Sequence, residues 1–190
     1  MRVAVFDDMT QCTEEEVQRM LPLVSEQRRE QALKYKHTLG QFCCLKSWLM
    51  LSALYIGEME FLYNEHGKPY IEGGPYFSIS HCKEGIAVAL DDQPVGIDIE
   101  AIRQADEELI ARTMNTEECK RLMAKSQKLR DRDFTRLWTQ KEAVLKCEGT
   151  GIQSFEQLQN IRLADYRIQT IEKEKYIYSI AYEKLCSISA

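Results

Sequence analysis

Two acidic residues, Asp98 and Glu100, interrupt the apolar segment "PVGIDIE" at residues 94–100. Side chains alternate along a strand with a period of two, so both acids would leave the same face of a strand. The opposite face would present Val95, Ile97 and Ile99. Such a pair fits either a half-solvated edge strand, with its acids in water, or a cation site. The strand alone favours the solvated edge, because acids at i and i+2 are common on exposed faces.

A second acid with chemical potential lies in the segment "WTQKEAVLKCEGTG". Glu142 and Lys146 are four residues apart, so they share one face of a helix. If that face is exposed, the pair contributes only about 0.3–0.5 kcal/mol. Trp138 and the apolar residues 143–145 instead predict a largely buried helix, in which an acid needs a partner. That partner is either Lys146 or a metal ion.

Ser80 and His81 end the predicted strand "YFSISH". Neighbouring residues on a strand point to opposite faces, so these two cannot form a nucleophile–base relay. A histidine at a strand end suits phosphate binding, although a lone histidine is more often structural.

Periodicity and capping signals predict the elements that would position these residues. Thr13 with Glu16, Ser25 and Thr116 are predicted helix caps, and Gly149 is a predicted helix end. The predicted helices span residues 13–21, 26–36, 41–55, 117–125 and 132–149. The predicted strands span residues 2–8, 76–81, 85–90 and 94–100, with a turn at 67–69 and a hairpin over 166–183. Neighbouring strands combined with long helices favour an α+β fold over a regular βαβ series.

Composition limits the classes of function. With 190 residues, the chain is predicted to form one large domain or two small ones. Its formal net charge of −5 argues against nucleic acid or a membrane surface as partners, so an anionic partner would need a local basic patch.

The composition of particular segments also bears on the cellular location of the protein. The N-terminus lacks the apolar core of a signal peptide, and the longest apolar stretch contains Lys46 and is too short to span a membrane comfortably. The seven cysteines form no C-x-x-C pair, since Cys43 and Cys44 are adjacent and the others are scattered, and they indicate neither a disulfide framework nor a zinc site. We therefore expect free thiols in a reducing cytoplasm.

Taken together, "GKP", "SISH", "VGIDIE" and "W-x-x-K-E-x-x-x-K-x-x-G-x-G", in this order, resemble the Sfp-type 4'-phosphopantetheinyl transferases. The resemblance spans residues 67–151, the centre of the chain. Members of that family transfer phosphopantetheine from coenzyme A to a serine of an acyl or peptidyl carrier protein. They require magnesium and release adenosine 3',5'-bisphosphate.

The resemblance implies a role for each acid. Asp98, Glu100 and Glu142 would be the magnesium ligands, which fits the preference of this ion for oxygen ligands. Glu142 would also accept the serine proton, directly or through a water, and Lys146 would stabilise the departing phosphate. Glu117 occupies a region where the family often has a further acid. An equally good interpretation is that it complements the dipole at a helix start.

The resemblance also implies contacts with coenzyme A. His81 and Lys68 would face the nucleotide together with Ser80, and the backbone of Gly67 and Pro69 would lie near adenine. His81 would thereby take part in catalysis as well. The 3'-phosphate would meet lysines in a region where relatives commonly have arginine, although solvated side chains are the simpler interpretation. These lysines are Lys34, Lys36 and Lys46.

An acidic carrier protein is the implied partner, and residues 120–136 provide a local basic stretch suited to steering it. The implied fold is a pseudo-twofold pair of similar α/β subdomains. We expect residues 1–93 to contact coenzyme A and residues 94–190 to form the metal site and contact the carrier. Such a fused pair predicts a monomer. Two alternatives remain, namely a catalytically weak relative that binds coenzyme A or a carrier, and another magnesium-dependent enzyme such as a pyrophosphohydrolase.

Overall fold

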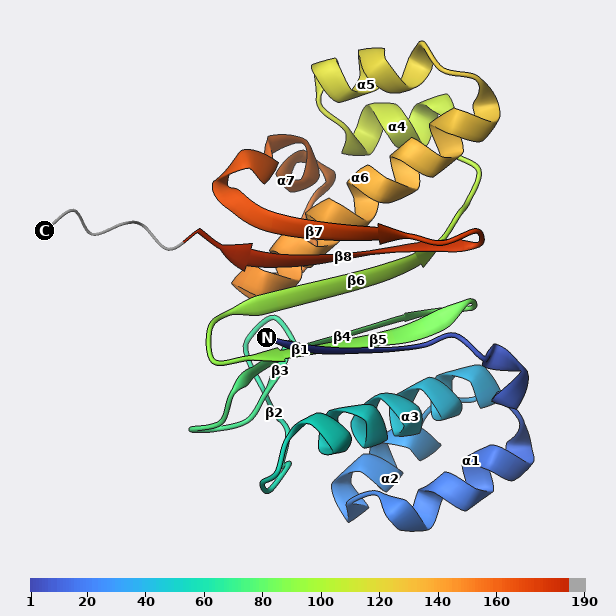
Figure 1. Ribbon diagram of the computed structural model, residues 1–190, viewed down its shortest axis with the longest axis vertical. Coiled ribbons are helices and arrows are strands. Elements are labelled where there is room, and N and C mark those ends of the chain that lie inside the picture. Colours follow the sequence, from blue (N-terminus) through green and yellow to red (C-terminus); the bar gives the residue numbers. More distant parts are fainter. Residues whose placement is uncertain (185–190) are drawn as a thin grey trace, which may run out of the picture.

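The computed structural model describes residues 1–184, and its N-terminal half contains a three-stranded antiparallel sheet (Figure 1). Strand β1 (Arg2–Phe6) forms one edge, β4 (Tyr76–Cys82) forms the other, and β5 (Gly85–Asp91) lies between them. Between β1 and β4 the chain forms two 3-10 turns (Met9–Gln11 and Leu21–Leu23), α1 (Glu14–Met20), α2 (Glu26–Leu33), α3 (Thr38–Leu54), β2 (Leu62–Tyr63) and β3 (Pro69–Tyr70).

The C-terminal half repeats this connectivity. Strand β6 (Val95–Ala101) and β7 (Tyr166–Glu172) form the edges of a second sheet, and β8 (Tyr176–Glu183) is its centre. The intervening helices are α4 (Glu107–Thr113), α5 (Thr116–Met123), α6 (Gln127–Glu148), α7 (Phe155–Asn160) and the 3-10 turn Leu163–Asp165. In both sheets the first and second strands flank the third, and this repeat of small antiparallel sheets packed with helices confirms the predicted α+β fold.

Four layers result, with α1–α3 on one outside, the two sheets in the middle and α6 on the other outside (Figure 1). The sheets face each other through apolar side chains, where Ala87 and Ala89 of β5 pack with Val95, Ile97 and Ile99 of β6. The other face of β6, which contains the two acids, lies against α6. Strand β6 is therefore covered on both faces, and the solvated-edge interpretation is wrong for it.

Most predicted boundaries agree with the structure, with two informative exceptions. The N-cap of α5 is Asn115, and Thr116 is the first helical residue. Asn115 forms a capping box with Glu118, whose carboxylate accepts from the Asn115 backbone N–H. Helix α6 begins at Gln127, earlier than predicted, and it ends at Gly149, where the left-handed conformation (φ 80°) suits glycine.

The six cysteines within the described residues have free thiols, and Cys186 lies outside that part of the chain. None of the helices found within residues 1–184 combines the length and the apolar character that a membrane crossing needs.

Candidate active site

Gly96 allows the two acid-bearing elements to come together. A Cβ atom at this position would lie 1.9 Å from the backbone oxygen of Ala143, so only glycine permits this approach of β6 to α6. The close contact brings residues two and four positions further along β6 next to the helix face that bears Glu142 and Lys146. The glycine of "VGIDIE" is thus a packing requirement of the site.

Asp98 is the centre of the site. It is 3% exposed, and its Oδ1 accepts hydrogen bonds from Ser80 Oγ of β4 and from Lys146 Nζ of α6, both at 2.7 Å. Its other oxygen, Oδ2, is buried and has no hydrogen-bond partner among residues 1–184. A buried carboxylate oxygen without a partner is costly, which suggests a role for a cation that completes the site.

The two other acids are electrostatically coupled to Asp98. Burial, followed by the charge of Asp98, raises the pKa of Glu142 to about 7. The same two causes, in the same order, raise the pKa of Glu100. Arg103 partly opposes both shifts, and its guanidinium lies 4.5 Å from the centre of the Trp138 ring. Lys146 and Arg103 therefore offset only part of the effect that burial and the charge of Asp98 have on the pKa values of Glu100 and Glu142.

The donor set fits magnesium, although the described residues do not form a ready-made cage. Within residues 1–184 no three His, Cys, Asp or Glu side chains are grouped so that they could hold a metal ion together. The carboxylate oxygens are nevertheless the ligand type that this ion prefers, and it commonly needs only a few of them. The Asp98 Oδ2 oxygen, which has no hydrogen-bond partner among residues 1–184, is therefore the atom best suited to contact such an ion.

A cavity of about 210 Å³ lies beside Lys146, at the junction of the two halves. The turn between β2 and β3 provides one wall, and the end of α6 provides another. Burial lowers the pKa of Lys68, whose ammonium lies 3.4 Å from the Cys147 carbonyl oxygen. The cavity is lined by His66, Gly67, Lys68, Pro69, Phe77, Ser78, Ile79, Leu145, Lys146, Gly149 and Gly151. Three residues predicted to contact the nucleotide thus share a cavity with the predicted phosphate-stabilising lysine.

His81 lies near this site at the end of β4, with its side chain exposed. Loss of hydration among the surrounding atoms lowers its pKa, and the charges of Lys146 and Arg28 lower it further. Arg28 was not predicted as a site residue. It is held in place by hydrogen bonds to the Cys44 carbonyl and Ser47 Oγ.

The remaining predicted residues do not line the cavity beside Lys146. Lys34 and Lys36 are exposed, and Lys46 Nζ lies 4.1 Å from the centre of the Phe6 ring. Glu117 is exposed on the first turn of α5, where it pairs with Lys120 at 3.0 Å.

Comparison with known proteins decides the family. The model of the 4'-phosphopantetheinyl transferase superfamily matches residues 94–185. A 4'-phosphopantetheinyl transferase of Bacillus subtilis is 30% identical over 159 residues, which are 79% of this chain and 71% of that protein. This chain belongs to the 4'-phosphopantetheinyl transferase superfamily.

Two further members show how much of a relative the chain spans. The transferase gsp of Aneurinibacillus migulanus is 32% identical over 118 residues, or 62% of this chain and 50% of gsp. The transferase Sfp of Bacillus subtilis (strain 168) is 29% identical over 149 residues, or 74% of this chain and 66% of Sfp. The matches thus span half to two thirds of these two curated relatives.

One buried residue of α6, Lys141, was not predicted from the sequence as part of the site. The Lys141 side chain has no exposed surface, and its Nζ donates to Glu118 Oε2 at 2.6 Å and to the carbonyls of Leu158 and Thr113 at 2.8 and 3.3 Å. It therefore connects α6 to α5, α7 and the end of α4. The sequence signal for this residue is a lysine close to the apolar residues 143–145, which indicates a buried lysine that needs an acidic partner.

The basic stretch at residues 120–136 is partly neutralised. Lys125 and Arg136 both pair with Asp133, and Arg132 pairs with Glu172 of β7 at 2.7 Å. Most of this stretch therefore offers less free positive charge than the sequence suggests.

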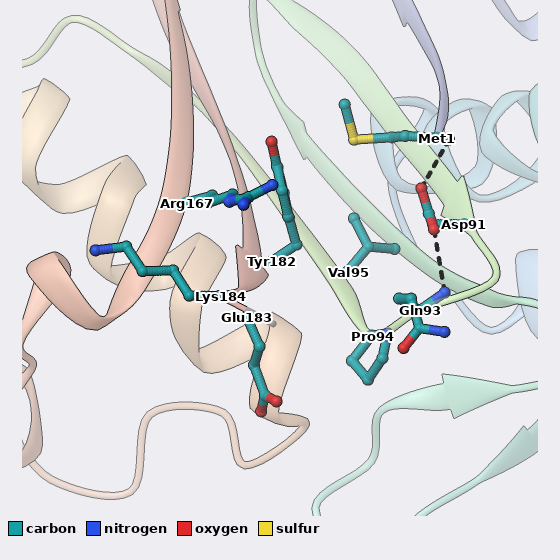
Figure 2. A pocket seen from close by; sticks show the side chains of 9 residues that line it. All are labelled: Met1, Asp91, Gln93, Pro94, Val95, Arg167, Tyr182, Glu183 and Lys184. Atoms are coloured by element: carbon teal, nitrogen blue, oxygen red, sulfur yellow. Dashed lines mark hydrogen bonds and ion pairs between the residues drawn. The ribbon is translucent and has the colours of Figure 1, made fainter. Parts of the chain in front are cut away.

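A separate cavity of about 450 Å³ opens where the residue before β1 lies near the start of β7 and the end of β8 (Figure 2). Neither Asp98 nor the two other acids line it, and its Asp91 already pairs with the Met1 amino group at 2.7 Å. This cavity is therefore separate from the three acids and from the cavity beside Lys146.

Proposed function

We propose that this protein transfers 4'-phosphopantetheine from coenzyme A to a serine of an apo acyl or peptidyl carrier protein. The observation that supports this most is the environment of Asp98. One buried oxygen is held by Ser80 and Lys146, the other has no partner among residues 1–184, and a cavity lined by the Gly67–Pro69 turn lies beside Lys146. The curated relatives named above are 4'-phosphopantetheinyl transferases.

In the proposed reaction, the serine oxygen bonds to the pyrophosphate phosphorus nearest to pantetheine. The bond from that phosphorus to the leaving oxygen breaks, and adenosine 3',5'-bisphosphate departs. Glu142 accepts the serine proton, directly or through a water, and its position on a half-buried helix face supports this role. Lys146 acts as a point charge for the departing phosphate, which its partly exposed ammonium can reach.

Asp98, Glu100 and Glu142 would hold Mg²⁺. The bound ion would neutralise charge on the pyrophosphate during displacement. The Lys146 ammonium partly compensates the charge of Asp98.

Coenzyme A would contact Gly67, Lys68, Pro69, Ser80 and His81, with Lys34, Lys36 and Lys46 directed to its 3'-phosphate. For Ser80 the hydrogen bond to Asp98 Oδ1 supports an additional role, because it would hold the Asp98 carboxylate in one orientation.

The two halves would divide this work. We assign coenzyme A contacts to residues 1–93, and the metal site and carrier contacts to residues 94–190. Residues 185–190 of the second unit lie outside the described structure. The internal face-to-face packing of two similar sheets supports a monomer, and the free thiols of the described cysteines suit a reducing cytoplasm.

The test is incubation of the protein with coenzyme A, magnesium and a panel of apo carrier proteins, followed by intact-mass measurement. We expect the mass of at least one carrier to increase by one phosphopantetheine, and Asp98→Ala to abolish this. Coenzyme A binding without a mass gain on any carrier would favour a binding relative. Release of adenosine bisphosphate without a carrier would favour a hydrolase.

A further inference from the structure

Asn64, at the start of the turn between β2 and β3, makes three side-chain hydrogen bonds. Its Oδ1 accepts from the backbone N–H groups of His66 at 3.0 Å and Lys68 at 2.8 Å. Its Nδ2 donates to the carbonyl of Gly149 at 2.9 Å. Two of these bonds shape the turn, and the third joins the turn to the end of α6, 85 residues later in the chain.

The end of α6 needs such a partner. The last carbonyls of a helix have no donors within the helix and carry partial negative charge. Here the Gly149 carbonyl is met by Asn64 and the Cys147 carbonyl by the ammonium of Lys68. The space for these contacts depends on Gly149, since an added Cβ there would lie 3.3 Å from the side chains of both Asn64 and Lys68.

The hydrogen bond between Asn64 and Gly149 connects two walls of the cavity beside Lys146. Gly67, Lys68 and Pro69 of the turn face Leu145, Lys146 and Gly149 of α6 across that cavity, whereas Asn64 itself does not line it. A shift of the turn relative to the helix end would therefore change the width of the cavity. Lys146, one turn before Gly149, would move with the helix end.

We propose that Asn64 is a positioning residue, whose hydrogen bond to the Gly149 carbonyl sets the separation between the Gly67–Pro69 wall and the Lys146 wall. This inference rests on the proposed function in one respect, namely that the cavity receives the nucleotide part of coenzyme A. The Asn64 side chain would then set both the affinity for the nucleotide and the position of Lys146, without contacting coenzyme A or the carrier protein.

Two substitutions separate this role from a role in the turn alone. Asn64→Ser keeps a short oxygen acceptor that can support the turn, but it lacks a donor that reaches Gly149. Asn64→Ala removes both the acceptor and the donor. If only the turn matters, Asn64→Ser will behave like the wild type. If the hydrogen bond to α6 matters, Asn64→Ser will behave like Asn64→Ala. Thr13→Ala is the matched control, because it removes one helix-capping bond, to Glu16 N–H, in α1.

The first measurement is amide hydrogen exchange of the protein without ligands. The N–H groups of Gly149 and Thr150 both donate to the Leu145 carbonyl, so they report on the end of α6. We expect their exchange to be about tenfold faster in Asn64→Ser, the consequence of losing roughly one hydrogen bond. The exchange of amide protons in α1 should be unchanged in Asn64→Ser and should increase only in Thr13→Ala. Unchanged exchange at Gly149 and Thr150 would overturn the proposal.

The second measurement is steady-state transfer at varied coenzyme A, with calorimetry of adenosine 3',5'-bisphosphate binding. We expect both Asn64 variants to raise KM for coenzyme A about tenfold and to lower kcat, while the carrier KM stays unchanged. Wild-type KM and kcat in Asn64→Ser would overturn the proposal. If the wild-type protein binds no coenzyme A, the proposed function fails, while the exchange result still decides whether Asn64 fixes the end of α6.

Discussion

The two halves of this protein share a strand order but differ in what lies between sheet and helix. In the N-terminal half, α3 covers its sheet with apolar contacts such as Leu51 against Val88 and Leu90. In the C-terminal half, the layer beneath α6 contains Asp98, and Ser179, which bonds to Thr139 of α6 at 2.9 Å. The two halves therefore share a strand order but not the residues that lie between sheet and helix. One copy keeps an apolar layer, and the other replaces part of that layer with polar groups that form the site.

The strongest test of this contrast is Asp98→Ala. We expect the transfer rate to fall by roughly a thousandfold, because the charge at the centre of the site is lost. The fold should persist, since Lys146 is partly exposed and can be solvated after its partner is removed. Glu142→Ala should have a similar effect. Intact-mass kinetics at saturating magnesium measure the loss, and near-normal rates in either variant would contradict the proposed ligand set.

Lys141→Met tests whether the C-terminal half is also held together by charge. The substitution leaves the Glu118 carboxylate buried without its cation, which should cost about 3–5 kcal/mol of unfolding free energy. Urea unfolding measures this cost, and Glu118→Met combined with Lys141→Met should restore much of it. Arg19→Met is the comparison in the N-terminal half, where an exposed pair with Glu16 should contribute less than about 1 kcal/mol. Equal effects of the two single variants would contradict this difference.

Leu45→Ala tests the apolar layer of the N-terminal half. Leu45 is fully buried in a cluster with Phe42 and Ile86, so the cavity should cost about 2–5 kcal/mol. Unlike Asp98→Ala, it should leave the transfer rate per folded molecule unchanged at low temperature. A rate loss as large as that of Asp98→Ala would show that the N-terminal layer takes part in the chemistry.

The smallest expected effect is on carrier recognition. Arg121→Glu should raise the carrier KM about threefold at low salt, and less at physiological ionic strength, because exposed charges are screened. The coenzyme A KM should stay the same. Lys125→Glu should have a weaker effect on the carrier KM, since Lys125 already pairs with Asp133. Equal changes in both KM values would remove the steering role of this surface.

The sequence predicted the strand that bears Asp98 and the helix that bears Glu142, because alternation and i, i+4 spacing are local properties. The αL end of α6 at Gly149 was predicted for the same reason. The sequence predicted Thr116 as the cap of α5, whereas the structure has Asn115, since both residue types can accept the capping bond and only the backbone angles distinguish them.

Other features could not be predicted, because they depend on residues that meet only after folding. Ser80 and Lys146 reach one oxygen of Asp98 from separate elements, 18 and 48 residues away in the chain. The pairing of Arg132 with Glu172 crosses from α6 to β7, so the basic stretch appeared more charged than it is. The coverage of the acid-bearing face of β6 likewise follows from the packing of α6.

The shared strand order has a consequence for synthesis on the ribosome. In each half the central strand, β5 or β8, is the last to be made, so neither sheet can form until its final hairpin has emerged. The N-terminal sheet is complete once β5 has left the exit tunnel, before β6 is available. The apolar face of this sheet would then be available to pack against Ile97 and Ile99 of β6 before β8 has been synthesised.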